Sequence, residues 1–134
     1  MSATVGPRLT TDADADAFIL AAGITDATQK SAINTLVVDL KGYSLWTKMD
    51  AIYPFVGGTS TTHKYNLKNP LDTDVAFRLV FNGGWTHSST GALPNGTNAY
   101  ANTFLVPNTT LSLNSAHISF YSRTNIASGV DIGA

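Results

Sequence analysis

Residues 11–42 read TDADADAFILAAGITDATQKSAINTLVVDLKG and carry the clearest periodicity in this chain of 134 residues. Their first part, residues 12–22, predicts a helix. Thr11 can cap its N-terminus, and Asp12 and Asp14 lie in the first turn, where the helix dipole favours negative charge. Gly23 predicts the end of this helix, because glycine readily adopts the left-handed conformation found after many helices.

A second helix is expected from Thr25 or Asp26 to about Lys41, with Gly42 as its end. Its apolar side chains recur at the i, i+3, i+4, i+7 spacing of an amphipathic helix. These residues are Ile33, Leu36, Val37 and Leu40. Such a stripe is ordinarily part of a core, and the alternative is an oligomer interface through which the chain attaches to sister subunits.

A third, short helix is expected over residues 44–50, before Pro54 bars its continuation. Short connections between these helices predict a helical hairpin or a three-helix cluster. The chain then divides into three segments. Residues 1–11 are expected to be an extended arm, residues 12–54 a helical segment for attachment and oligomerisation, and residues 55–134 a β-rich region.

The pattern in the β-rich region is one of short strands separated by loops rich in Gly, Asn, Ser and Thr. The expected strands are residues 51–56, 63–67, 76–82, 98–104 and 117–123, and the longest expected loops are 82–96 and 106–116. This pattern predicts an α+β fold in which an antiparallel, jelly-roll-like sandwich follows the helices. Five short strands do not close two sheets, so the sandwich is expected to be incomplete within this chain.

The composition excludes several classes of function. Charged residues make up 13% of the chain, and the net charge is −1 with an isoelectric point near 6.2. Binding to nucleic acid is therefore not expected, because it relies on clustered positive charge. The chain has no cysteine, which excludes disulfides and thiolate metal ligands. No apolar run reaches the roughly 18 residues of a membrane-spanning helix, so membrane insertion is not expected.

Residues 79–122 contain no Lys, Arg, Asp or Glu. A surface without charge has to be solvated by hydroxyl and amide groups or covered by a partner. The segment FNGGWTHSSTGALPNGTNAYANTFLVPNTTLSLNSAHISFYSRTN, residues 81–125, resembles the opening strands of concanavalin A/laminin-G-like jelly-roll domains in structural proteins of tailed bacteriophages. The helical block before it is similar to the segment that commonly precedes this domain in such proteins.

This resemblance implies a virion protein of the fibre or appendage type, located in the virion. Its partners would be other virion proteins and copies of itself, with a trimer favoured. A glycan on the host surface is a further expected partner, because domains of this kind serve in host attachment. The resemblance implies no particular reaction.

The residues offer weak grounds for catalysis or metal binding. Asp72 and Asp74 are the acidic pair nearest the predicted strands, and their place in a turn-like segment suits capping or solvation better than glycoside hydrolysis. His87 lies in a loop without the Gly-x-Ser-x-Gly pattern of a serine hydrolase. His63, His87 and His117 match no compact metal-ligand spacing, and His63 and His117, which flank predicted strands, are expected at the surface. No enzyme activity, cofactor or metal is therefore expected.

A sugar-binding surface is the remaining candidate site. It would combine the aromatic faces of Trp85 and Tyr100 with the amide groups of Asn95 and Asn98, since aromatic rings and amides suit a polyol. In the alternative interpretation, Trp85 and Tyr100 pack in the core or in an interface. The expected function is thus a non-enzymatic structural component of a tailed-phage virion, and the alternative is a glycan-binding module for host adhesion.

Overall fold

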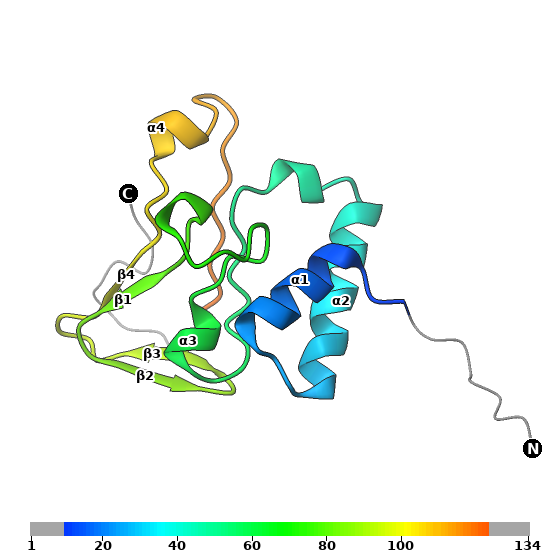
Figure 1. Cartoon of the computed structure of the whole chain (residues 1–134). Coiled ribbons are helices and arrows are strands. Elements are labelled where there is room, and N and C mark those ends of the chain that lie inside the picture. Colours follow the sequence, from blue (N-terminus) through cyan, green and yellow to red (C-terminus); the bar gives the residue numbers. More distant parts are fainter. Residues whose placement is uncertain (1–9, 124–134) are drawn as a thin grey trace, which may run out of the picture. The chain divides into compact units, whose positions relative to one another are not determined.

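The computed structural model describes residues 10–123, which fall into two compact units on either side of the Phe104–Leu105 bond. Figure 1 shows the helices and strands in chain order. The first unit contains α1 (Ala13–Ala22), α2 (Ala27–Gly42), a 3₁₀ turn (Trp46–Lys48), α3 (Ser60–His63), a second 3₁₀ turn (Asp74–Ala76), β1 (Val80–Asn82), β2 (Trp85–Ser88), β3 (Gly91–Pro94) and β4 (Tyr100–Asn102). The second unit contains α4 (Pro107–Thr110). The expected mixture of helices and antiparallel strands is confirmed.

The helical hairpin forms as expected, and its ends follow from local chemistry. Asp12, rather than Thr11, caps α1 by accepting a hydrogen bond from the backbone N–H of Asp14 at 2.9 Å. Gly23 ends α1 in the left-handed conformation with φ of 67°. Asp26 caps α2 through the N–H of Gln29 at 2.8 Å. These caps satisfy backbone groups that the helix itself leaves without partners.

The end of α2 differs from the sequence expectation. Gly42 is the last residue of the helix, and Ser44 adopts the left-handed conformation with φ of 57°. The N–H groups of Ser44 and Leu45 donate to the carbonyls of Lys41 and Leu40, which is the Schellman arrangement. The expected third helix over residues 44–50 is reduced to the single 3₁₀ turn at Trp46–Lys48.

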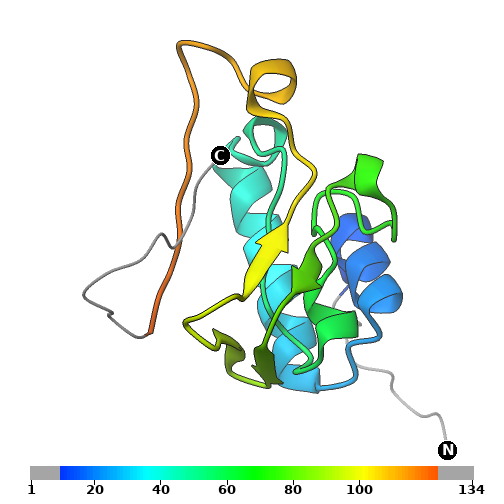
Figure 2. The same ribbon diagram turned by 90° about the vertical axis from the view of Figure 1, so that its left-hand side faces the viewer.

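The core lies between α1, α2 and the chain that follows them. Its buried apolar members are Ala15, Phe18, Ala22, Ile24, Ile33, Val37 and Leu67. Figures 1 and 2 show α1 packed beside α2, with α3 and the strands on one side of this helical hairpin. Ile33 and Val37 therefore belong to the core of this chain, whereas Leu40 is half-buried and Leu36 is exposed. Of the four residues predicted to form an oligomer interface, Leu36 and Leu40 are therefore the two that remain accessible to another subunit.

A buried amide holds the irregular segments after the helices. Asn66 is 0% exposed, and its Oδ1 accepts the N–H groups of Ile52 and Lys68, each at 3.0 Å. Its Nδ2 donates to the carbonyls of Ala76 at 3.1 Å and Asp50 at 3.3 Å. Because every polar atom of the side chain is satisfied, its burial stabilises these three segments in one arrangement.

The strands are fewer and shorter than the sequence pattern predicts. β1 pairs with β4 and β2 pairs with β3, both antiparallel, so the described residues form two separate two-stranded sheets. Residues 51–56, 63–67 and 117–123 are not strands. The expected strand 76–82 is shortened because Phe77 follows a 3₁₀ turn in the left-handed conformation, with φ of 58°. Residues 82–96, expected to be a loop, contain the β2–β3 hairpin.

The second unit has little regular structure in its described part. After α4, a turn closes through a bridge between Ser112 and Ser115. Residues 116–121 make no backbone hydrogen bond with any other described residue. The apolar side chains of this unit are largely exposed: Val106, Leu113, Ile118, Phe120 and Tyr121.

Candidate functional site

Five aromatic rings form a cluster where α3 meets the β2–β3 hairpin. Phe55 precedes α3, His63 ends α3, Phe81 lies in β1, and Trp85 and His87 lie in β2. Phe81 occupies the centre, with its ring centroid 4.6 Å from that of His87, 5.3 Å from that of Trp85 and 6.4 Å from that of Phe55. These contacts are mostly edge-to-face, which suits the ring quadrupoles. The sequence pattern singles out no such cluster.

The two histidines of the cluster are joined by one hydrogen bond. The backbone N–H of Gly58 donates to Nε2 of His63 at 3.2 Å, so this nitrogen is an acceptor. The proton of a neutral His63 is therefore on Nδ1, and it is donated to Nδ1 of His87 at 2.8 Å. His87 in turn carries its proton on Nε2. Both imidazoles are thus neutral, with both tautomers fixed by the hydrogen bonds.

The surroundings of the pair favour this neutral state. His63 is 1% exposed, and burial lowers its pKa to about 4, with a smaller contribution from the nearby His87. Burial also lowers the pKa of His87. A buried imidazolium would lose hydration that the aromatic rings do not replace. The expectation that His63 lies at the surface is therefore wrong, and His87, expected in a loop, is a half-buried residue of β2.

The four residues of the predicted sugar site do lie close together. The indole N–H of Trp85 donates to the carbonyl of Asn82 at 2.9 Å and to that of Tyr100 at 3.3 Å. Asn95 Nδ2 donates to Asn98 Oδ1 at 2.7 Å. The Tyr100 side chain is exposed, whereas Trp85 is half-buried in the aromatic cluster.

The side-chain amides of Asn95 and Asn98 form hydrogen bonds within their own loop. Asn95 Oδ1 accepts backbone N–H groups of Thr97, Asn98 and Ala99. Asn98 Oδ1 accepts the N–H of Gly84 at 3.3 Å. The loop closes tightly on Gly83, where an added Cβ would lie 2.2 Å from the carbonyl oxygen of Asn98. What the loop presents to a ligand is therefore Tyr100 and the remaining amide hydrogens.

No family model, curated protein or solved structure matches the chain.

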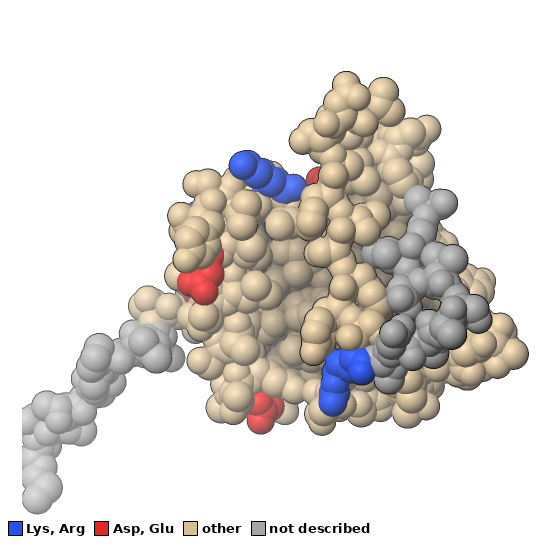
Figure 3. Space-filling view, turned by 180° about the vertical axis from the view of Figure 1, so that it is seen from behind, with Lys and Arg blue, Asp and Glu red and all other residues tan. Residues whose placement is uncertain are grey.

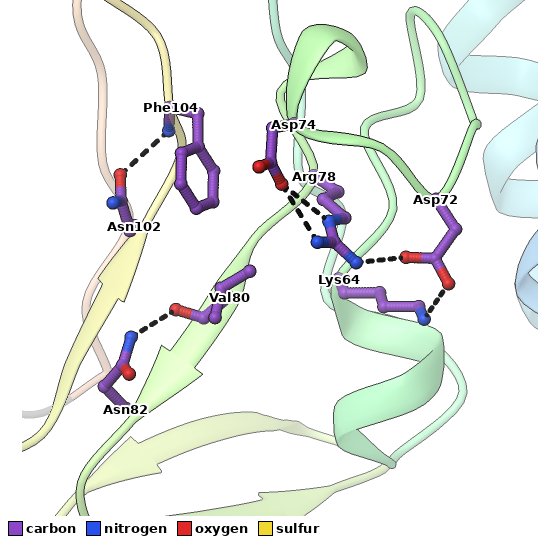
Figure 4. A network of polar contacts seen from close by, with 8 residues as sticks. All are labelled: Lys64, Asp72, Asp74, Arg78, Val80, Asn82, Asn102 and Phe104. Carbon is purple, nitrogen blue, oxygen red and sulfur yellow. Dashed lines mark hydrogen bonds and ion pairs between the residues drawn. The ribbon is translucent and has the colours of Figure 1, made fainter.

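The acidic pair of the sequence analysis belongs to an ion network, drawn in Figure 4. Asp72 contacts Lys64 at 2.5 Å and Arg78 at 2.9 Å, and Asp74 contacts Arg78 at 2.9 Å. Hydrogen bonds from Lys64 and Arg78 hold the pKa of Asp72 below its usual range. A general acid needs a raised pKa, so this network suits a structural link between α3 and the turn before β1 better than glycoside hydrolysis.

Over residues 10–123, no three His, Asp or Glu side chains converge to hold a metal ion. No helix in this range is long and apolar enough to cross a bilayer. On the face shown in Figure 3, few charged side chains interrupt a largely uncharged surface. This face is thus suited to contacts through apolar and neutral polar groups.

Proposed function

We propose that this chain is a non-enzymatic structural component of a tailed-phage virion, in the form of a fibre, appendage or surface decoration. The helical segment attaches it to the particle, and the β region is displayed as the beginning of a lectin-like jelly roll. The resemblance of residues 81–125 to phage jelly-roll domains supports this proposal. The observation that carries it is the segment over residues 116–121, which is exposed, contains no Lys, Arg, Asp or Glu, and makes no backbone hydrogen bond with any other described residue.

This segment has the properties of a strand that pairs with another subunit. Ile118 and Phe120 alternate with His117 and Ser119, so one face of an extended segment is apolar. Ile118 is 57% exposed and Phe120 53%. Charges usually protect exposed strand edges from pairing, and residues 79–122 contain none. A second copy of the chain is the partner we propose, because each copy supplies both an unpaired segment and open sheet edges.

The two-stranded sheets supply those edges. With two strands in each sheet, β1, β2, β3 and β4 are all edge strands within the described residues. Two-stranded sheets are marginal on their own in water, and further strands stabilise them. Pairing between copies in a trimer would extend the sheets toward the sandwich that the sequence pattern predicts.

The test is the mass of the purified chain in solution, measured by size exclusion with light scattering. We expect a trimer for the wild type. Ile118→Asp should produce a monomer, because a charge on the apolar face opposes burial against another copy. Ser119→Asp places the same charge on the other face and should leave the trimer intact. A wild-type chain that is monomeric up to millimolar concentration would overturn the proposal.

A second candidate function is recognition of a host-surface glycan. It is favoured by the exposed ring of Tyr100 beside the ordered Asn95–Asn98 loop. On a glycan array, Tyr100→Ala should abolish any binding that the wild type shows. Tyr43→Ala, which removes another exposed tyrosine, far from this loop in the sequence, should leave it unchanged. Absence of wild-type binding on the array would count against this candidate.

A further inference from the structure

The histidine pair joins two elements that lie far apart in the sequence. His63 ends α3, and His87 lies in the middle of β2, 24 residues later. The loop before α3 also touches the hairpin turn, since an added Cβ on Gly58 would lie 3.0 Å from the backbone nitrogen of Ser89. The β2–β3 hairpin thus rests on α3 through one side-chain hydrogen bond and close backbone contact.

The pair has no place for an additional proton. In the neutral state, the two available lone pairs are those of His63 Nε2 and His87 Nδ1. The first accepts from Gly58 N–H, and the second accepts from His63 Nδ1–H. A proton added to either nitrogen brings two N–H groups face to face and breaks one of these hydrogen bonds.

The surrounding elements bring no compensating charge. Around the pair, β1 contributes Phe81 and the segment before α3 contributes Phe55, and neither side chain has a titratable group. Lys64, the next residue after His63, is ion-paired with Asp72. Among these neighbours, no carboxylate contacts either imidazole, so an imidazolium here would remain buried without an anionic partner.

We propose that the His63–His87 pair is an acid-sensitive latch, and that its protonation releases the β2–β3 hairpin from α3. Release gives both imidazoles access to water and uncovers the rings of Phe55 and Phe81. The released hairpin, which pairs from Trp85↔Pro94 to Ser88↔Gly91, is a two-stranded sheet without further support, so its backbone hydrogen bonds open readily in water. This device does not depend on the proposed virion role.

The difference in histidine pKa between the latched and the released state determines how strongly pH changes the release of the hairpin. A released histidine takes up a proton near pH 6.5, whereas the latched His63 does so only near pH 4. We call the equilibrium constant for release of the hairpin from α3 the opening constant. Between these pH values, each released imidazole raises the opening constant by up to about tenfold for each pH unit that the pH falls. Burial lowers the pKa of His87 as well, so His87 adds to the effect of His63. The wild-type opening constant should therefore rise by more than about tenfold per pH unit between pH 6 and 5.

The test is hydrogen exchange of the full chain between pH 7.0 and 5.0, read as protection factors after correction for the intrinsic rates. We expect residues 85–94 to lose protection steeply as the pH falls, while α1 and α2 stay more protected than the hairpin at every pH. Equal protection of hairpin and helices throughout would mean that only global unfolding exposes the pair. That result would overturn the latch, as would a hairpin whose protection does not change with pH.

Two variants separate the pair from histidine titration in general. In His87→Asn, the amide oxygen can accept the proton of His63 Nδ1 but does not itself titrate. Its opening constant should therefore rise by no more than about tenfold per pH unit, because only one imidazole remains. His117→Asn removes the histidine outside the pair and should show the wild-type dependence. The same slope in all three proteins would contradict the proposal.

Discussion

A single amide side chain accounts for much of the order in the segments without regular structure. Asn66 connects residues near Asp50 and Ile52 to Ala76, across positions that no short-range pattern relates. An asparagine in a polar stretch ordinarily predicts a turn. The sequence therefore gives no signal for its burial, because that burial depends on which distant backbone groups need partners. The same reason explains why His63 was not expected in the interior.

We predict that Asn66→Ala lowers the free energy of unfolding by about 3 kcal/mol, since it leaves several buried N–H and carbonyl groups without partners. Urea denaturation of the variant and the wild type measures this difference. Asn69→Ala is the matched control, because Asn69 is exposed and lies in the same turn. It should change the free energy by less than about 0.5 kcal/mol. Similar losses for both variants would contradict the assigned role of Asn66.

At the scale of elements, α1 and α2 were predictable, whereas of the five expected strands only those over residues 76–82 and 98–104 form, each in part, as β1 and β4. The ends of α1 and α2 are set by Asp12, Gly23 and Asp26, which act on backbone groups only a few residues away. A strand, in contrast, needs a partner elsewhere in the chain or in another molecule. The alternation of Ile118 and Phe120 is typical of a strand, and the described residues supply it with no partner. For the candidate site, Trp85 and Tyr100 do lie close together, whereas the aromatic cluster depended on contacts between distant elements.

The two glycines at the helix ends make a sharp test of this local control. At both Gly23 and Gly42 an added Cβ would meet nothing within 4 Å, so the sites differ in backbone conformation rather than in space. Gly23→Ala should lower the free energy of unfolding by about 1 kcal/mol, because φ is 67° there. Gly42→Ala should raise it by about 0.5 kcal/mol, because α2 includes this residue. Thermal or urea unfolding checks both signs, and equal signs would refute the argument.

At the scale of the whole molecule, acid should act on stability in two successive steps. The ion pairs of Asp12 with Lys41, and of Asp72 with Lys64 and Arg78, hold the pKa values of both carboxyl groups below their usual range. Carboxylates with a lowered pKa stabilise the folded chain above their unfolded pKa near 4 and lose this contribution as the pH falls further. The carboxylates therefore account for a loss of stability only at strongly acidic pH.

The histidine pair places the first step at higher pH. Between pH 6.5 and about 4, the unfolded chain binds a proton at His63 that the folded chain does not, so the free energy of unfolding falls as the pH falls. The shift corresponds to about 3 kcal/mol for His63 over the whole interval. Urea midpoints at half-unit steps from pH 8 to 3 measure it. His63→Asn should reduce the slope above pH 4 to the contribution of His87 without removing the carboxylate step, whereas His117→Asn should leave both steps in place. A wild-type curve that is flat between pH 7 and 4 would mean that the folded pair takes up protons as readily as the unfolded chain does, which would contradict the hydrogen bonds of His63 with Gly58 and His87.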